Sequence, residues 1–305
     1  MNAIEWDGKT ITQPGVYVGI SLSDYHEKLD LLDAPSVSKS NLKHLFPSLG
    51  GSPKKFWHLW KHNPNHITPK TKPQFNLGKA THCLMLGDEV FEEAFSVSPF
   101  DDFRTKAARE WKAEQESEGR TIVTAEQIEL IKRMAEDAAR DPMVQQGILN
   151  GSVERSMFIK DKKTGLWFKS RPDNLALDGF FADLKTTSSM DEKFIRRQIK
   201  DNGYFIQGGG CRMAARELGL PFDSFTNVYV CTGETPDTQA IELDPEDLEL
   251  GEALIRRGLD IIAECTESGV WPGARPYDGR TARIGDWDRE AIEQDLKSPA
   301  LEQAA

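Results

Sequence analysis

Three residues in the middle of the chain have the types and spacing needed to hydrolyse a phosphodiester with the help of a metal ion. Asp173 follows Arg171-Pro172, and nine residues separate it from Asp183, which begins the run Asp183-Leu184-Lys185. Two adjacent carboxylates repel each other unless a cation neutralises them, and Mg²⁺ prefers one or two carboxylates together with water and substrate phosphate. Such an ion activates water and polarises the phosphate, while a lysine beside it orients or deprotonates the attacking water and offsets charge in the transition state.

The turn signal Asp178-Gly179 lies midway between the two aspartates. A hairpin there would place Asp173 and Asp183 nearly opposite each other on adjacent strands. Asp183 and Lys185 are two positions apart, so on a strand their side chains share a face. The alternative is a surface hairpin in which Lys185 forms a simple salt bridge with one aspartate, because the Asp-x-Lys spacing is common.

Helical patterns precede this segment, and strand patterns surround it. The capping-box pair Thr124 and Gln127 opens one predicted helix, and a helical stretch over 191–218 has a possible break at Asp201-Asn202-Gly203. Strands are predicted at 153–159, 166–171, 174–177, 180–184, 225–231 and 238–243, and further helices at 76–95 and 244–268. This order predicts an α/β (α+β) fold with a central mixed sheet flanked by helices. We expect an irregular arm over 1–14, one domain over 15–272, and a polar, partly disordered tail over 273–305.

The composition is that of a soluble protein with a negative net charge. The 305 residues carry a net charge of −11, which argues against a DNA partner, although a nuclease needs positive charge only along its groove. No apolar run reaches the roughly 20 residues that cross a bilayer, and the N-terminus lacks a signal-peptide pattern, so we expect a cytoplasmic protein without membrane contact. The four cysteines form no CxxC pair, which disfavours a zinc or iron–sulfur site. The sequence contains no GxxxxGK[ST] loop, so we do not expect the protein to use ATP.

Pro172-Asp173 and Asp183-Leu184-Lys185 resemble the signature of the PD-(D/E)xK nucleases, whose restriction-endonuclease-like core is the fold that the resemblance implies. Further stretches resemble the RecE-type (exonuclease eight) branch of bacterial and phage recombination exonucleases. They are Gly15–Tyr17 with Asp24–His26, the Ser-x-Ser-x-Leu pattern at Ser38, Ser40 and Leu42, Leu77–His82, and Lys185–Thr187. The similarity runs from about Gly15 to Pro272.

The resemblance implies a role for each matching residue. Lys185 would be the catalytic lysine, with Gln207 of the following helix beside it. The implied cofactor is Mg²⁺, with Mn²⁺ as an alternative, bound as two ions. Glu154 would bind the second ion or face solvent. The metal ligands implied by the resemblance are His82, Asp173, Asp183 and the carbonyl of Leu184.

The chain departs from the family pattern just after Gln207. The family places a tyrosine four residues later, where this chain has Cys211, and Tyr204 lies one turn before Gln207. Gly208-Gly209-Gly210 is also unusual, because each glycine inside a helix costs roughly 1 kcal/mol relative to alanine. Either the helix breaks there, or something packs very close to it, such as a DNA backbone or a neighbouring subunit.

Several polar residues are candidate DNA contacts. Ser38 and Ser40 could donate to a phosphate at a helix N-terminus, or could simply be N-caps. Four further candidates have cationic or aromatic side chains that could contact DNA phosphates, or that could simply face solvent: Arg104, Lys106, Arg171 and Tyr204.

The resemblance implies an exonuclease that digests one strand of linear double-stranded DNA from its 5′ end. It would leave a 3′ overhang for a single-strand annealing protein in DNA recombination and repair. The family acts as a ring around DNA, which implies a homo-oligomer. The alternatives are a single-strand or structure-specific nuclease of the same superfamily, and a non-catalytic DNA-binding protein on the same scaffold.

Overall fold

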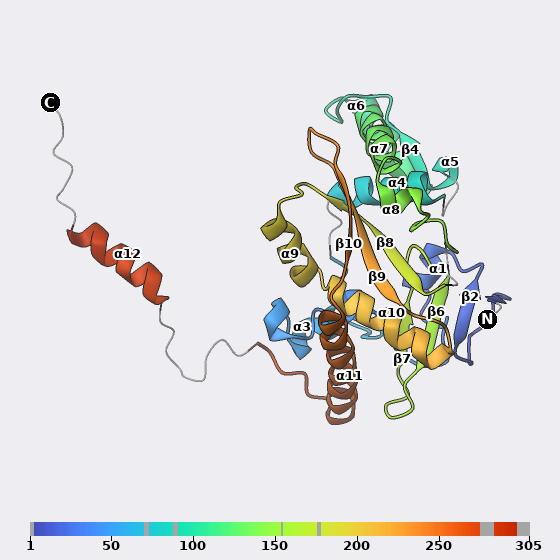
Figure 1. Cartoon of the computed structure of the whole chain (residues 1–305), viewed down its shortest axis with the longest axis vertical. Helices are drawn as coiled ribbons and strands as arrows, with labels where there is room; N and C mark the ends of the chain where they lie inside the picture. Colours follow the sequence, from blue (N-terminus) through green and yellow to red (C-terminus); the bar gives the residue numbers. More distant parts are fainter. Residues whose placement is uncertain are drawn as a thin grey trace.

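The computed structural model describes residues 3–69, 73–87, 91–153, 155–175, 178–274 and 284–297 (Figure 1). Its strands form a five-stranded sheet in the order β1-β2-β6-β7-β3, a three-stranded sheet in the order β10-β9-β8, and the pair β4-β5. The strands are β1 (Ile4–Glu5), β2 (Gly15–Val18), β3 (Ser36–Val37), β4 (Phe95–Val97), β5 (Thr121–Val123), β6 (Ser156–Lys160), β7 (Trp167–Ser170), β8 (Phe180–Thr187), β9 (Ser224–Cys231) and β10 (Thr238–Glu242).

Helices flank these sheets on both sides. They are α1 (Leu22–Glu27), α2 (Lys39–Leu42), α3 (Pro53–Leu59), α4 (Pro73–Leu86), α5 (Phe91–Ala94), α6 (Lys106–Ser117), α7 (Ala125–Ala138), α8 (Pro142–Gln145), α9 (Glu192–Asp201), α10 (Tyr204–Leu218), α11 (Pro245–Ser268) and α12 (Asp286–Lys297), with a 3-10 turn at Pro47–Leu49. None of the helices in the described ranges is both long and apolar enough to cross a membrane.

The predicted mixed α/β fold with a central mixed sheet between helices is confirmed. Strand β8 pairs with β9 in parallel over its full length, and β9 pairs with β10 antiparallel. The parallel pairing requires a crossover, which α9 and α10 provide. The expected hairpin across Asp178-Gly179 is present only as the antiparallel bridge between Asn174 and Ala182, and the predicted strand at 174–177 lies partly outside the described residues.

Strand β8 separates two parts of the hydrophobic core. Phe181 packs in the cluster that contains residues of α10 and α11, whereas Ala182 and Leu184 pack in the cluster that contains residues of α4 and α7. Because side chains alternate along a strand, Asp183 and Lys185 emerge on the same side as Phe181, toward α10. Full burial of side chains such as Phe181 and Leu184 contributes about 1.5–3 kcal/mol each, so packing on both faces holds the strand that carries the two charged residues.

Local signals place several element ends where the sequence predicts them. Thr124 caps α7, with the Gln127 side chain completing the capping box, and Asp244 caps α11. The predicted break between α9 and α10 falls at Gly203, whose φ of 67° is one that glycine adopts without steric cost. This break sets the direction of α10, which carries Gln207 toward β8.

The glycine triplet does not interrupt α10, which is continuous from Tyr204 to Leu218. The close neighbour is helix α11 of the same chain. A Cβ on Gly209 would lie 2.5 Å from the Leu248 carbonyl oxygen and 2.8 Å from the Glu252 amide nitrogen, and one on Gly251 would lie 2.3 Å from the Phe205 carbonyl oxygen. The two helix backbones therefore touch, which explains why α10 tolerates glycine here.

Gly209→Ala is expected to destabilise the protein although alanine is the better helix former. The added methyl meets backbone atoms of α11, which cannot rotate away, so the helices must separate. Overpacking of this kind typically costs 1–3 kcal/mol, and the roughly 1 kcal/mol gain in helix propensity offsets only part of it. Thermal unfolding measures the change. Gly219→Ala is not a suitable control because of its positive φ, so Ala253→Gly, at an exposed position of α11, reports helix propensity alone. A Gly209→Ala protein that melts above wild type would contradict the contact.

Both ends of the chain contain more regular structure than the sequence suggests. Ile4–Glu5 add a parallel edge strand to β2, within the segment expected to be irregular. Trp271 stacks on Trp57 with ring centroids 4.5 Å apart, and the Pro272 carbonyl accepts a hydrogen bond from the Lys54 amide. Beyond this point, α12 forms within the predicted polar tail, where Asp286 and Asp288 favour the first turn of a helix.

Candidate active site

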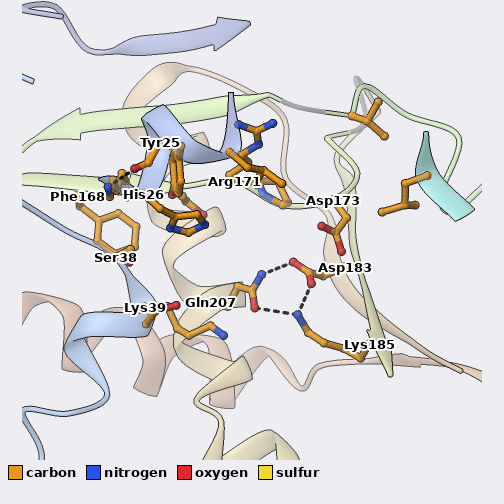
Figure 2. Close-up of a pocket in the computed structure, with 17 residues that line it drawn as sticks. Tyr25, His26, Ser38, Lys39, Phe168, Arg171, Asp173, Asp183, Lys185 and Gln207 are labelled. Atoms are coloured by element: carbon orange, nitrogen blue, oxygen red, sulfur yellow. Dashed lines mark hydrogen bonds and ion pairs between the residues drawn. The ribbon is translucent and has the colours of Figure 1, made fainter. Parts of the chain in front are cut away.

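A cavity of about 220 Å³ lies where β7, β8, α2 and α10 meet (Figure 2). Asp173, Asp183, Lys185 and Gln207 line one part of it, and cationic side chains such as Lys169 and Arg171 line another. The residues that the sequence singles out for chemistry therefore share one cavity with a concentration of positive charge.

The two aspartates approach each other as the turn between them predicts. Asn174 and Ala182 exchange backbone hydrogen bonds. Asp173 and Asp183 are the next pair, one position farther from the turn, and therefore lie side by side. The Asp173 carboxylate accepts a hydrogen bond of 2.7 Å from the Leu184 amide. This bond fixes Asp173 against the strand that carries Asp183.

Asp183 is bound by two side chains on the α10 side of β8. Lys185 forms an ion pair with one carboxylate oxygen, and the Gln207 amide donates to the other. The Gln207 carbonyl in turn accepts from the Lys185 ammonium at 3.3 Å, as the dashed lines in Figure 2 show. The side chains of Lys185 and Asp183 are only 12% and 3% exposed, so this is a buried ion pair.

The site shifts the pKa values of the two carboxylates in opposite directions. Burial, followed by repulsion from Asp173, raises the pKa of Asp183 to about 6. Burial alone would raise the pKa of Asp173 as well, but the neighbouring His82 and Lys185 outweigh it and lower that pKa to about 2. Carboxylates that compete in this way are typical of a functional site and of one that a cation would stabilise.

His82 reaches this site from α4. Its Nδ1 lies 3.3 Å from a carboxylate oxygen of Asp173. Burial would lower the pKa of His82, but the charge of Asp173 and its hydrogen bond outweigh burial and raise it. The structure therefore brings His82 to Asp173, as the resemblance implies, and leaves a buried imidazole beside two carboxylates.

The donor set fits a hard divalent cation, although the side chains are not arranged around one. Within the described ranges, no three His, Cys, Asp or Glu side chains form a group that could hold a metal ion, and both oxygens of Asp183 contact Lys185 or Gln207. The repulsion that raises the pKa of Asp183 is nevertheless what a divalent cation would remove. Asp173, Asp183 and His82 are the residues that would hold it.

Tyr204 lies beside Lys185. Its ring centre lies 4.6 Å from the Lys185 ammonium, a cation–π distance. Cys211, at the position where the resemblance implies a tyrosine, is fully buried and lies 3.2 Å from the Ser170 hydroxyl. Burial raises the pKa of Cys211 to about 12, which keeps it a neutral packing residue.

The remaining predicted residues divide into three groups. Ser38, Ser40 and Arg171 line the cavity, and Ser38 also caps α2. Arg104 and Lys106 lie away from it, in exposed ion pairs with Asp102 and Glu110. Glu154 lies outside the described residues. The DNA contacts predicted for the serines and arginine in the cavity, and for Arg104 and Lys106 outside it, stay predictions.

The cavity residues that sequence reasoning did not assign to the site include four with aromatic or basic side chains, namely Tyr25, His26, Lys39 and Lys169. Lys39 lies between the two serines of the Ser-x-Ser pattern, and Lys169 is a lysine inside the otherwise apolar strand β7. Burial, together with the nearby Lys61, lowers the pKa of Lys169 to about 8. A charged residue inside an otherwise apolar strand is a sequence signal that could have identified Lys169. The sequence around Lys39 offers no such signal.

A solved structure shares the fold of this chain. The chain resembles the crystal structure of the "Putative exonuclease" from Eubacterium rectale, with a TM-score of 0.56 and 15% identity over 84% of this chain and 93% of that one. It also aligns with an alkaline exonuclease (LHK-Exo) from Laribacter hongkongensis at 15% identity, over 63% of this chain and 97% of that one, with a TM-score of 0.24. A search of curated proteins finds no match.

The family model that matches the chain is the PDDEXK-like domain of unknown function DUF3799, and the match covers residues 38–275. This range is most of the chain and includes His82, Asp173, Asp183, Lys185 and Gln207. Nucleases with this type of domain generally use divalent metal ions. The chain therefore belongs to the DUF3799 family of PD-(D/E)xK-like domains.

Proposed function

We propose that this protein is a divalent-metal-dependent nuclease that hydrolyses the phosphodiester bonds of DNA. The proposal rests on one observation: the side chains of Asp173, Asp183, Lys185 and Gln207 line the same cavity. There the pKa of Asp183 is raised and the pKa of Asp173 is lowered. A surface hairpin with an ordinary salt bridge would not bury Asp183 and Lys185 or connect them to Gln207.

Each residue has a distinct part in this reaction. Asp173 and Asp183 would hold the metal, with the Leu184 carbonyl and His82 as further ligands. When bound, a divalent ion polarises the scissile phosphate and stabilises the departing oxygen. Lys185, held as an ammonium by its ion pair with Asp183, orients the attacking water and offsets negative charge in the transition state. Gln207 and Tyr204 position the Lys185 ammonium, through a hydrogen bond and a ring contact. We assign Mg²⁺ as the ion, in two sites.

The proposed substrate is linear double-stranded DNA, digested from the 5′ end to leave 3′ overhangs for recombination. The RecE-type sequence features support this assignment, as does the cationic part of the cavity, which suits a phosphate backbone despite the net charge of −11. We further propose a cytoplasmic, ring-shaped homo-oligomer acting with a single-strand annealing protein. A ring would turn basic residues toward the DNA and leave an acidic exterior.

A single assay tests the proposed function. The protein is incubated with Mg²⁺ and with end-labelled linear duplex, circular duplex or single-stranded DNA, and products are resolved over time. We expect digestion of the linear duplex only, with loss of the 5′ label first and no product when EDTA removes the metal. Cleavage of circles or of single strands would instead identify a structure-specific or single-strand nuclease. Binding without any cleavage would identify a non-catalytic DNA-binding protein.

A further inference from the structure

Lys39 places an ammonium group near that of Lys185 in the active-site cavity, from a helix that carries no residue of the nuclease signature. It is the first residue of α2 and lines the cavity between Ser38 and Ser40. Figure 2 shows its side chain extending toward Gln207 and Lys185 from the side opposite Asp173. Lys39 and Lys185 lie over the same ring, with their nitrogens 5.1 Å and 4.6 Å from the centre of Tyr204.

The two lysines differ in how their charge is balanced. Lys185 is paired with Asp183. For Lys39, no ion pair and no side-chain hydrogen bond is present among the described residues, and the Tyr204 ring is its contact. Burial, then repulsion from Lys185, lowers the pKa of Lys39 to about 7, while Asp183, Asp173 and Lys43 act as weaker influences. A half-buried cation without an anionic partner is costly in the free protein.

An anionic ligand in the cavity would supply the missing partner. We propose that Lys39 binds a non-bridging oxygen of the DNA phosphate that occupies the cavity, on the side opposite Asp173. The inference rests on the proposed function for the identity of the ligand as DNA. It assigns Lys39 to substrate binding, whereas Lys185 acts on the attacking water.

The arrangement predicts that replacing Lys39 stabilises the free protein but weakens DNA binding. A lysine with a purely structural role would not show this combination. In the free protein, Lys39 repels Lys185, so replacing it by methionine removes a like-charge contact while keeping the aliphatic length. With DNA bound, the same replacement removes a phosphate contact. Arginine keeps the charge and suits phosphate as well.

The test compares wild type with Lys39→Met and Lys39→Arg in the full-length protein. Binding of a short duplex in EDTA is measured by fluorescence anisotropy across a potassium chloride series, and thermal unfolding is measured at pH 6 without DNA, where Lys39 is protonated. One lost phosphate contact lowers the slope of log K against log salt by about 1 and the affinity by about tenfold near 0.1 M salt. We expect this for Lys39→Met, with Lys39→Arg close to wild type. The melting temperature of Lys39→Met is expected to rise by about 2 °C.

Lys132→Met is the matched control, since Lys132 is an exposed lysine of α7, on the other side of β8 from α10. It should leave the salt slope unchanged. If Lys39→Met has the slope and affinity of wild type, or if it lowers the melting temperature and arginine restores only stability, then Lys39 serves the packing of Tyr204 and the inference is wrong. If wild type binds DNA with a Lys39-dependent slope but cuts none, the inference stands and the proposed catalysis fails. If wild type cleaves DNA and Lys39→Met does not change DNA binding, the proposed catalysis stands and the inference on Lys39 fails.

Discussion

Asp183→Asn is expected to reduce the rate of DNA hydrolysis by on the order of 10³-fold or more while leaving the protein folded. Asparagine keeps the shape of the side chain and can still accept a hydrogen bond from Lys185 or from Gln207 through its one carbonyl oxygen, but it removes one of the two charges that would hold a divalent cation. Loss of metal-assisted stabilisation of a phosphate transition state is worth several kcal/mol, and each 1.36 kcal/mol is a factor of ten in rate.

Initial rates on end-labelled linear duplex DNA in excess Mg²⁺ provide the measurement. Asp178→Asn makes the same chemical change at an exposed turn position five residues earlier, where asparagine before glycine is also favourable, and it should retain wild-type activity. Equal rates for the Asp183→Asn variant and wild type would remove Asp183 from the reaction and leave it as a structural partner of Lys185.

Lys185→Met is expected to abolish activity and also to destabilise the protein. The substitution leaves Asp183 buried without its cation, next to Asp173. Breaking a buried ion pair by removing one partner typically costs 3–5 kcal/mol, because the remaining charge is uncompensated. At roughly 2–4 °C per kcal/mol for a domain of this size, the melting temperature should fall by on the order of 10 °C.

The pH dependence of this destabilisation separates electrostatics from lost packing. The pKa of Asp183 in the folded protein, about 6, is above its ordinary value of 3.8. The folded state therefore retains a proton through that range, and stability falls as the pH rises through it. Without Lys185 the folded pKa rises further, so the loss at pH 8 should exceed the loss at pH 5, where Asp183 is protonated and needs no partner.

The double variant Asp183→Asn/Lys185→Met serves as the control for the same pair. It should recover most of the stability lost in Lys185→Met, because no uncompensated charge remains, yet it should stay inactive. If Lys185→Met melts like wild type at pH 8, the ion pair contributes nothing to stability, and the buried geometry of the site is supported by packing alone.

The sequence alone determined those features of the site that depend on neighbours within a few residues. Alternation along a strand places Asp183 and Lys185 on one face, and the glycine after Asp178 turns the chain so that Asp173 lies beside them. The break at Gly203 and the capping box at Thr124 are local in the same sense. Such features follow from backbone geometry and short-range hydrogen bonds, which a pattern of residue types records directly.

Only the tertiary structure brings the distant residues of the site together. His82 and Gln207 are named by the resemblance but are far from the signature in sequence, and Lys39 is not singled out by the sequence at all; the three come from α4, α10 and α2. Helix α10 packs directly on α11 because its glycines allow the two backbones to touch. The parallel pairing of β8 with β9, rather than a meander, follows from that crossover. The raised pKa of Asp183 and the unbalanced charge of Lys39 depend on burial and on neighbours remote in sequence. The aspartates and the lysine of the PD-(D/E)xK-like signature are thus placed by local geometry, whereas their pKa values and partners are set by long-range packing, which no short pattern encodes.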